Sequence, residues 1–96
     1  METSQSNTMK SKITIRVTKM DIERGFPLSE NRCPVALAAS RAFHKPMSAV
    51  PSSIWERSAS RSIWDKRIKL PESVGAKMIA YDQGKGMKPF QFTVSI

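Results

Sequence analysis

The chain has 96 residues, of which 40% are hydrophobic and 25% charged. This length allows one domain with one modest core and is too short for a second core. It carries 16 Lys and Arg against 8 Asp and Glu, and this net charge of +8 favours a polyanion or an acidic protein face as partner. One cysteine excludes an intramolecular disulfide, and no apolar stretch has the length of a membrane span or a signal-peptide core. We therefore expect a cytoplasmic protein that makes no contact with a membrane.

Polar residues dominate positions 1–12 and predict a disordered lead-in, which leaves residues 13–96 as a single α+β domain. Apolar and polar residues alternate over Ile13–Thr18, which predicts a strand with one buried face. The spacing of the threonine at its end from Asp21 is typical of a capping box, so one helical turn follows and ends at Gly25.

Two longer helices are predicted. Cys33 takes the N-cap of the first, and Pro34–Phe43 follows with proline at the first helical position. Its several alanines imply a close approach to a sheet. The second helix is expected over Glu72–Gln83, with proline before it and Gly84 as its stop.

A short repeat marks the middle of the chain, where the residues of Ser53–Arg57 return in similar form nine positions later. The four polar residues between the two copies have the length of a hairpin turn, so we predict paired strands at Ser53–Arg57 and Ser62–Leu70. Met47–Ser52 is expected to be a linker. Strict alternation over Phe90–Ile96 predicts the closing strand.

The element order is β-α-β-β-α-β. It predicts one four-stranded antiparallel or mixed sheet with both helices on one face, as in the ferredoxin-like arrangement, with the first strand beside Ser62–Leu70 in the middle of the sheet. A looser α+β meander of the same elements is the alternative. The predicted core consists of Ile15, Val17, Val35, Leu37, Ile68, Leu70, Val74, Met78, Phe92 and Val94.

Several short stretches resemble a family of small, largely uncharacterised bacteriophage and prophage proteins. They are Ile15-Arg16-Val17-Thr18, Asp21-Ile22, Gly25, Cys33-Pro34-Val35-Ala36-Leu37-Ala38 and Arg41-Ala42. The later order of Leu70-Pro71-Glu72, Asp82-Gln83-Gly84 and Pro89-Phe90 is similar too. The repeated hairpin with its tryptophans and the long polar N-terminus depart from the family. The resemblance implies a viral origin and a compact α+β fold, and it carries over no active site. The expected cytoplasmic location is then the cytoplasm of the host cell.

Catalysis and metal binding find little support in the sequence. A thiol at a helix N-terminus, as at Cys33, has a lowered pKa, but the single histidine, His44, lies at the other end of that helix, roughly 16 Å away. We therefore favour a small buried cap for this cysteine. One Cys and one His cannot hold zinc, and Gly84-Lys85-Gly86 departs from the phosphate-loop patterns. We predict no enzyme, no cofactor and no metal site.

The hairpin is the predicted binding surface, made of Trp55, Arg57, Arg61, Lys66, Arg67 and Lys69. Trp64 is expected in the core, whereas for Trp55 a core role and a role as an exposed anchor stay open. The predicted function is that of a non-enzymatic phage accessory protein, of host-takeover or anti-defence type, which binds a host or viral protein complex. The alternative is a small basic nucleic-acid-binding protein that uses the hairpin over residues 53–70. If the hairpin is only structural, the loop Phe26–Arg32 is the next candidate.

Overall fold

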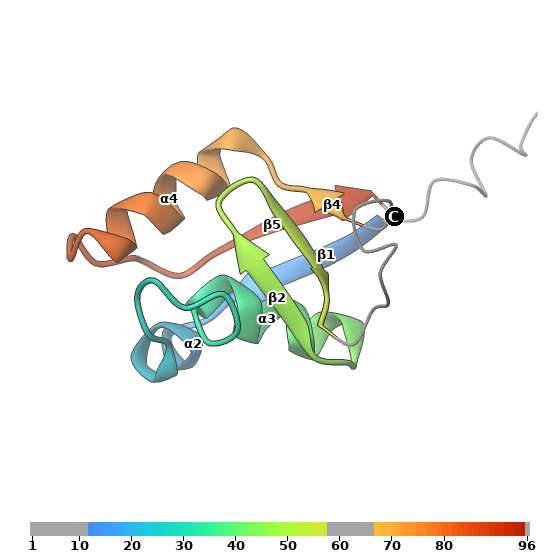
Figure 1. The fold of residues 1–96 in the computed structure, drawn as a ribbon, viewed down its shortest axis with the longest axis horizontal. Helices are drawn as coiled ribbons and strands as arrows, with labels where there is room; N and C mark the ends of the chain where they lie inside the picture. The colour runs from blue at the N-terminus through green and yellow to red at the C-terminus, as the bar shows by residue number, and fades with distance from the viewer. Residues whose placement is uncertain (1–11, 58–66, 96) are drawn as a thin grey trace, which may run out of the picture.

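The computed structural model describes residues 12–57 and 67–95, and its elements confirm the α+β class and a compact single domain. In chain order they are β1 (Lys12–Val17), α2 (Lys19–Arg24), α3 (Pro34–Phe43), β2 (Met47–Val50), β3 (Ser53–Glu56), β4 (Ile68–Lys69), α4 (Glu72–Asp82) and β5 (Phe90–Ser95) (Figure 1). Both longer helices and both terminal strands lie where the sequence predicts them. The predicted lead-in and most of the second hairpin strand, with Trp64, lie outside the described residues.

The strands form two antiparallel sheets, so the prediction of a single four-stranded sheet is wrong. β1 pairs with β5, and β3 lies between β2 and β4 in a second sheet. Among the described residues β1 has no neighbour but β5, which corrects the expected place of the first strand beside Ser62–Leu70. The physical reason is β2, because the predicted linker Met47–Ser52 supplies a strand. The two residues Pro51 and Ser52 then close a hairpin, the shortest connection open to β3.

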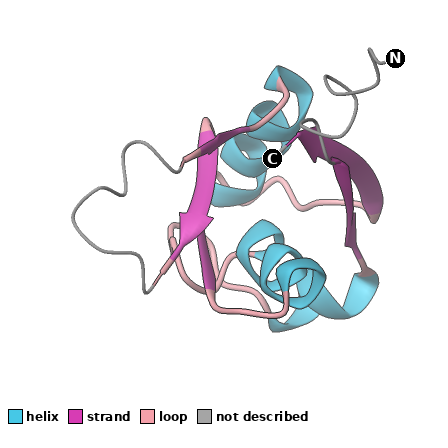
Figure 2. Cartoon of the chain, turned by 90° about the vertical axis from the view of Figure 1, so that its right-hand side faces the viewer, coloured by secondary structure: helices cyan, strands magenta, loops and turns pink. Residues whose placement is uncertain are grey.

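Helix α3 lies at the centre of the fold and packs on β1 of one sheet and on β2 of the other. Figure 2 shows the two sheets on opposite sides of the molecule with helices between them. The small side chains of Ala36, Ala38 and Ala39 are buried, and they let both sheets approach the helix closely. Helix α4 also packs tightly, because a Cβ on Gly75 would lie 2.5 Å from the carbonyl oxygen of Pro51 in the β2–β3 turn.

Most of the predicted core is confirmed. Leu37, Ile68 and Phe92 are the exceptions, since each is only half-buried, and Leu37 lies beside the inward-facing residues of α3 and not among them. The core also contains Met47, Ala49, Ile54 and Trp55, which belong to the hairpin that joins the second sheet. The predicted linker therefore contributes to the core.

A buried carboxylate ties three elements together at one end of α3. Asp21 is 4% exposed and accepts hydrogen bonds from the backbone N–H and the hydroxyl of Thr18 at 2.8 and 3.1 Å. Both terminal nitrogens of Arg41 donate to the two oxygens of Asp21, each at 2.8 Å. Nη2 of Arg41 also donates to the carbonyl oxygen of Arg16 in β1 at 2.8 Å. This network fixes α2 and β1 against α3.

The network also sets the protonation of Asp21. Burial acts to raise the pKa of Asp21, but the hydrogen bonds from Arg41 and Thr18 outweigh it and hold the pKa below its usual range. The same contact raises the pKa of Arg41. The pair is therefore charged at neutral pH.

We expect Asp21→Asn to lower the free energy of unfolding by about 1–3 kcal/mol at pH 7, a value reduced from that of a fully buried pair because the Arg41 side chain is 54% exposed. The folded pKa of Asp21 lies below 3.8, so its contribution is fully present above that value and is lost as the pH falls through the folded pKa. Urea unfolding of wild type and Asp21→Asn should give a constant difference in the free energy of unfolding around neutral pH. This difference should disappear as the pH falls and Asp21 becomes protonated.

The control for this variant is Glu23→Gln, which removes an exposed carboxylate 3.9 Å from Lys19 and should change stability very little. Equal stability of wild type and Asp21→Asn at pH 7 would contradict the role given to the network.

Candidate functional site

The structure places β3 and β4 as an antiparallel pair, as the repeat predicts, but in a different register. A four-residue turn would pair Ser53 with Lys66, whereas the observed partner of Ser53 is Lys69. The register of the described pairs is therefore shifted by three residues from the predicted one. Of the six residues of the predicted surface, Arg61 and Lys66 lie outside the described residues, and the binding role of the whole set stays a prediction.

Trp55 lies in the core of the free chain. It is 7% exposed, and the guanidinium carbon of Arg67 lies 3.9 Å from the centre of its ring system. Nη1 of Arg67 donates to Oγ of Ser53 at 3.1 Å, which holds the guanidinium over the ring. The structure thus gives this pair a packing role in the second sheet and covers the ring that an exposed anchor would present.

Arg57 and Lys69 occupy different environments. Nη2 of Arg57 donates to the carbonyl oxygens of Met47 at 2.9 Å and of Asn31 at 3.2 Å, so this side chain links the β2–β3 hairpin to the loop Phe26–Arg32. Lys69 is exposed on β4. Arg57 is therefore directed toward α3 and the loop, where it meets two arginines that the sequence analysis did not single out.

These arginines line a groove of about 470 Å³, which we call the arginine groove. Its lining residues are Arg24, Phe26, Asn31, Arg32, Leu37, Ser40, Pro46 and Arg57. The three arginines come from the end of α2, the loop and the end of the hairpin, and the lining residues that the structure describes include no Asp or Glu. Such a concentration of one sign of charge in a hollow attracts anionic groups.

Arg24 and Arg32 differ from Arg57, the third arginine of the groove. Both side chains are exposed, and neither makes a hydrogen bond or an ion pair with another side chain in the part of the chain that the structure describes. Beside them, Phe26 is 54% exposed. Two available guanidinium groups and an apolar ring therefore share one hollow.

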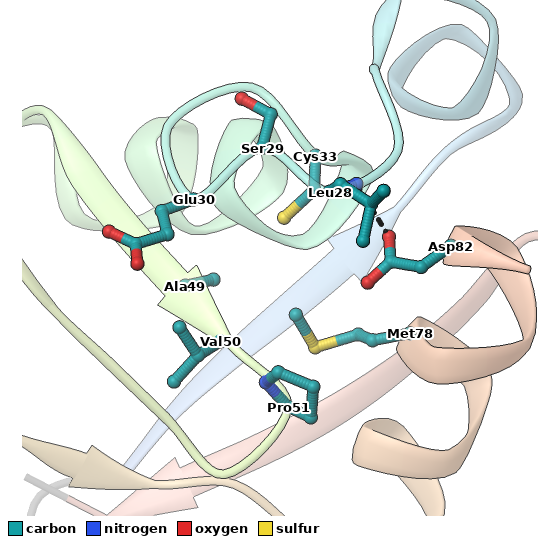
Figure 3. Close-up of a pocket in the computed structure, with 9 residues that line it drawn as sticks. All are labelled: Leu28, Ser29, Glu30, Cys33, Ala49, Val50, Pro51, Met78 and Asp82. Atoms are coloured by element: carbon teal, nitrogen blue, oxygen red, sulfur yellow. Dashed lines mark hydrogen bonds between the residues drawn. The ribbon is translucent and has the colours of Figure 1, made fainter.

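The loop Phe26–Arg32 separates this groove from a smaller pocket. That pocket, of about 180 Å³, is drawn in Figure 3 and includes Cys33, Met78 and Asp82 in its lining. Burial raises the pKa of the Cys33 thiol and outweighs the nearby N–H groups of Ala36 and Val35, which act in the opposite direction. The protonated thiol agrees with the buried cap expected from the sequence.

His44 forms the C-cap of α3, at the opposite end from Cys33, so the two residues do not meet. Within residues 12–57 and 67–95, no three side chains of the His, Cys, Asp and Glu types come together as metal ligands would. In the same residues no helix has the length and apolar character of a membrane span. Comparison of the chain with protein-family models, with curated proteins and with solved structures found no match.

We expect Trp55→Ala to destabilise the protein by about 3–5 kcal/mol, because truncation of a buried Trp leaves a cavity and removes the support of Arg67. Chemical denaturation measures the loss. Trp55→Phe keeps a ring under the guanidinium and should cost clearly less. An unchanged melting temperature in Trp55→Ala would show that the ring does not pack in the core.

Among the residues that the structure describes, two other than glycine have positive φ: Leu28 and His44, both at 58°. This left-handed conformation costs a residue with a Cβ atom about 1–2 kcal/mol. A glycine avoids that cost, but part of the gain is offset because glycine loses more conformational entropy on folding. We therefore expect Leu28→Gly and His44→Gly each to raise the free energy of unfolding by roughly 0.5–1 kcal/mol, and with it the melting temperature.

The Leu28 side chain is 82% exposed, so its removal sacrifices little packing. The N–H of residue 28, which donates to Oδ1 of Asp82 at 2.8 Å, is kept in the glycine variant. Scanning calorimetry of the two variants checks the expectation, and a fall in melting temperature for Leu28→Gly would mean that its side chain supports the loop.

Proposed function

We propose that this protein is a non-enzymatic binding protein that attaches to an acidic face of a host or viral protein complex through the arginine groove. The observation that carries the proposal is that Arg24, Arg32 and Arg57, from three separate elements, line one hollow whose described lining includes no Asp or Glu. Guanidinium groups bind carboxylates in a bidentate manner, which gives both attraction and orientation. A role as a phage accessory protein in the host cytoplasm fits this mode of action.

The groove supports the proposal better than the hairpin does. Trp55 and Arg67 stack on each other in the free chain, so binding through them would first require their separation. Arg24 and Arg32 need no such rearrangement, since their side chains are exposed. Arg57 belongs to both sets, and the proposed surface therefore keeps one residue of the predicted hairpin and moves its centre to the loop Phe26–Arg32.

Nucleic-acid binding is the second candidate. The observation that favours it is the exposed ring of Phe26 beside Arg24 and Arg32, because single-stranded nucleic acids bind by stacking of bases on aromatic rings and by phosphate contacts to cations. Phosphate contacts give a steep dependence of affinity on salt, and this separates the two candidates.

We expect the double variant Arg24→Gln/Arg32→Gln to fold normally, since exposed substitutions usually change stability within about 0.5 kcal/mol each. It should lose the partner that wild type retains from host lysate after nuclease treatment, because the two free cations of the groove are gone. The measurement is affinity capture with and without nuclease, read by mass spectrometry, together with fluorescence anisotropy of labelled oligo-dT at several salt concentrations.

The matched control is Lys85→Gln/Lys88→Gln, which removes the same charge from exposed positions outside the groove. Equal loss of the partner in both double variants would reduce the effect to net charge and reject the groove. Loss of every partner on nuclease treatment, with a steep salt slope for oligo-dT, would favour the second candidate.

A further inference from the structure

We infer that the arginine groove receives an extended acidic peptide segment that carries one large apolar side chain. The inference rests on the proposed function and narrows it from an acidic face to a short linear segment. It comes from the lining of the groove, which combines three arginines with three apolar residues.

The apolar lining residues are Phe26, Leu37 and Pro46, and we call them the floor of the groove. Phe26 is 54% exposed and Leu37 is half-buried, so the free protein leaves apolar surface in water directly beside its free guanidinium groups. A flat acidic surface would form ion pairs with the arginines but would leave the apolar floor exposed to water. A segment that offers carboxylates on both sides of an apolar side chain covers both kinds of surface, and the volume of about 470 Å³ lies within the range of ordinary ligand pockets.

The wall of the groove is held in place before any ligand arrives. Within the loop, the N–H of Phe26 donates to the carbonyl oxygen of Arg32 at 2.9 Å. The carbonyl oxygen of Glu30 accepts from Ala49 of β2 at 2.8 Å, and the N–H of Leu28 donates to Asp82 of α4 at 2.8 Å. Because the loop is tied to two other elements, binding has little ordering entropy to overcome.

The arrangement of charges favours a peptide over a nucleic acid. A strand of DNA or RNA needs cations that follow its backbone and several rings that take successive bases. Among the residues that the structure describes, the lining of the groove instead holds three arginines in one hollow and a single aromatic residue, Phe26. Carboxylates match guanidinium groups in planar, paired hydrogen bonds, which suits this short array.

The test uses fluorescein-labelled heptapeptides Asp-Glu-Asp-X-Asp-Glu-Asp, with X as Phe, Leu or Ser, and oligo-dT of the same charge, all measured by anisotropy with the full chain. We expect the Phe and Leu peptides to bind about tenfold more tightly than the Ser peptide, because only they cover the floor. Phe26→Ala should abolish this preference and leave the affinity for the Ser peptide unchanged. Arg24→Gln/Arg32→Gln should weaken all three peptides alike.

The matched control is Ile79→Ala, which removes a 48% exposed apolar side chain from α4 outside the groove and should preserve the tenfold preference. Equal affinities for the three peptides, still dependent on Arg24 and Arg32, would overturn the inference and leave the proposed function standing. Binding of oligo-dT in preference to every peptide, lost in the arginine variant, would overturn both. Failure of all peptides to bind at millimolar concentration would overturn the inference, and the nuclease-resistant partner would then decide the proposed function separately.

Discussion

The junction of α2, α3 and β1 depends on one ion pair, the bidentate contact between Arg41 and the buried Asp21. The carboxylate begins as the acid of a local capping box with Thr18, and that box alone would hold only a single short helix. Because Arg41 reaches it from the last turn of α3 and also donates to a carbonyl of β1, the same carboxylate sets where α2, α3 and β1 meet. The close contact of Gly25 with Pro34 follows from this, since a Cβ there would lie 2.7 Å from the proline Cδ. The loop Phe26–Arg32 therefore begins at a fixed point after α2. This also positions Asn31 and Arg32, which line the groove.

The sequence predicts those parts of the fold that local physical chemistry decides. Proline at the first helical position predicts α3, strict alternation predicts β5, and Thr18 with Asp21 predicts the capping box, all as the structure has them. It does not predict β2, because Met47, Ser48 and Ala49 are all buried. A strand buried on both faces loses the period of two by which strands are recognised, and four residues are too few for composition to replace it. Without β2, β3 lacks its second neighbour, and the remaining strands are then predicted to form a single sheet.

The candidate site shows a second limit, because its residues lie far apart along the chain. Arg24, Arg32 and Arg57 belong to a helix end, a loop and a strand end, and no spacing in the sequence relates them. Two signals were nevertheless present: Arg57 stood in the predicted surface, and the loop Phe26–Arg32 was the alternative to it. For Trp55 the sequence leaves a core role and an anchor role open. Arg67 covers the ring and so favours the core role, and the register of β4 sets the approach of Arg67 to the ring.

Arginines in this protein divide into those that hold the fold and those that do not, and a count of charges cannot separate the two. Arg41 binds Asp21, Arg57 binds two carbonyl oxygens through one nitrogen, and Arg67 covers Trp55. Of these three, Arg41 has its charge offset by a carboxylate, whereas Arg57 and Arg67 keep their charge and use part of their hydrogen-bonding capacity within the fold. Arg24 and Arg32 keep their hydrogen-bonding capacity and lie beside an exposed ring. The free chain leaves these two guanidinium groups and the ring of Phe26 in water, and an acidic partner with an apolar side chain would cover all three.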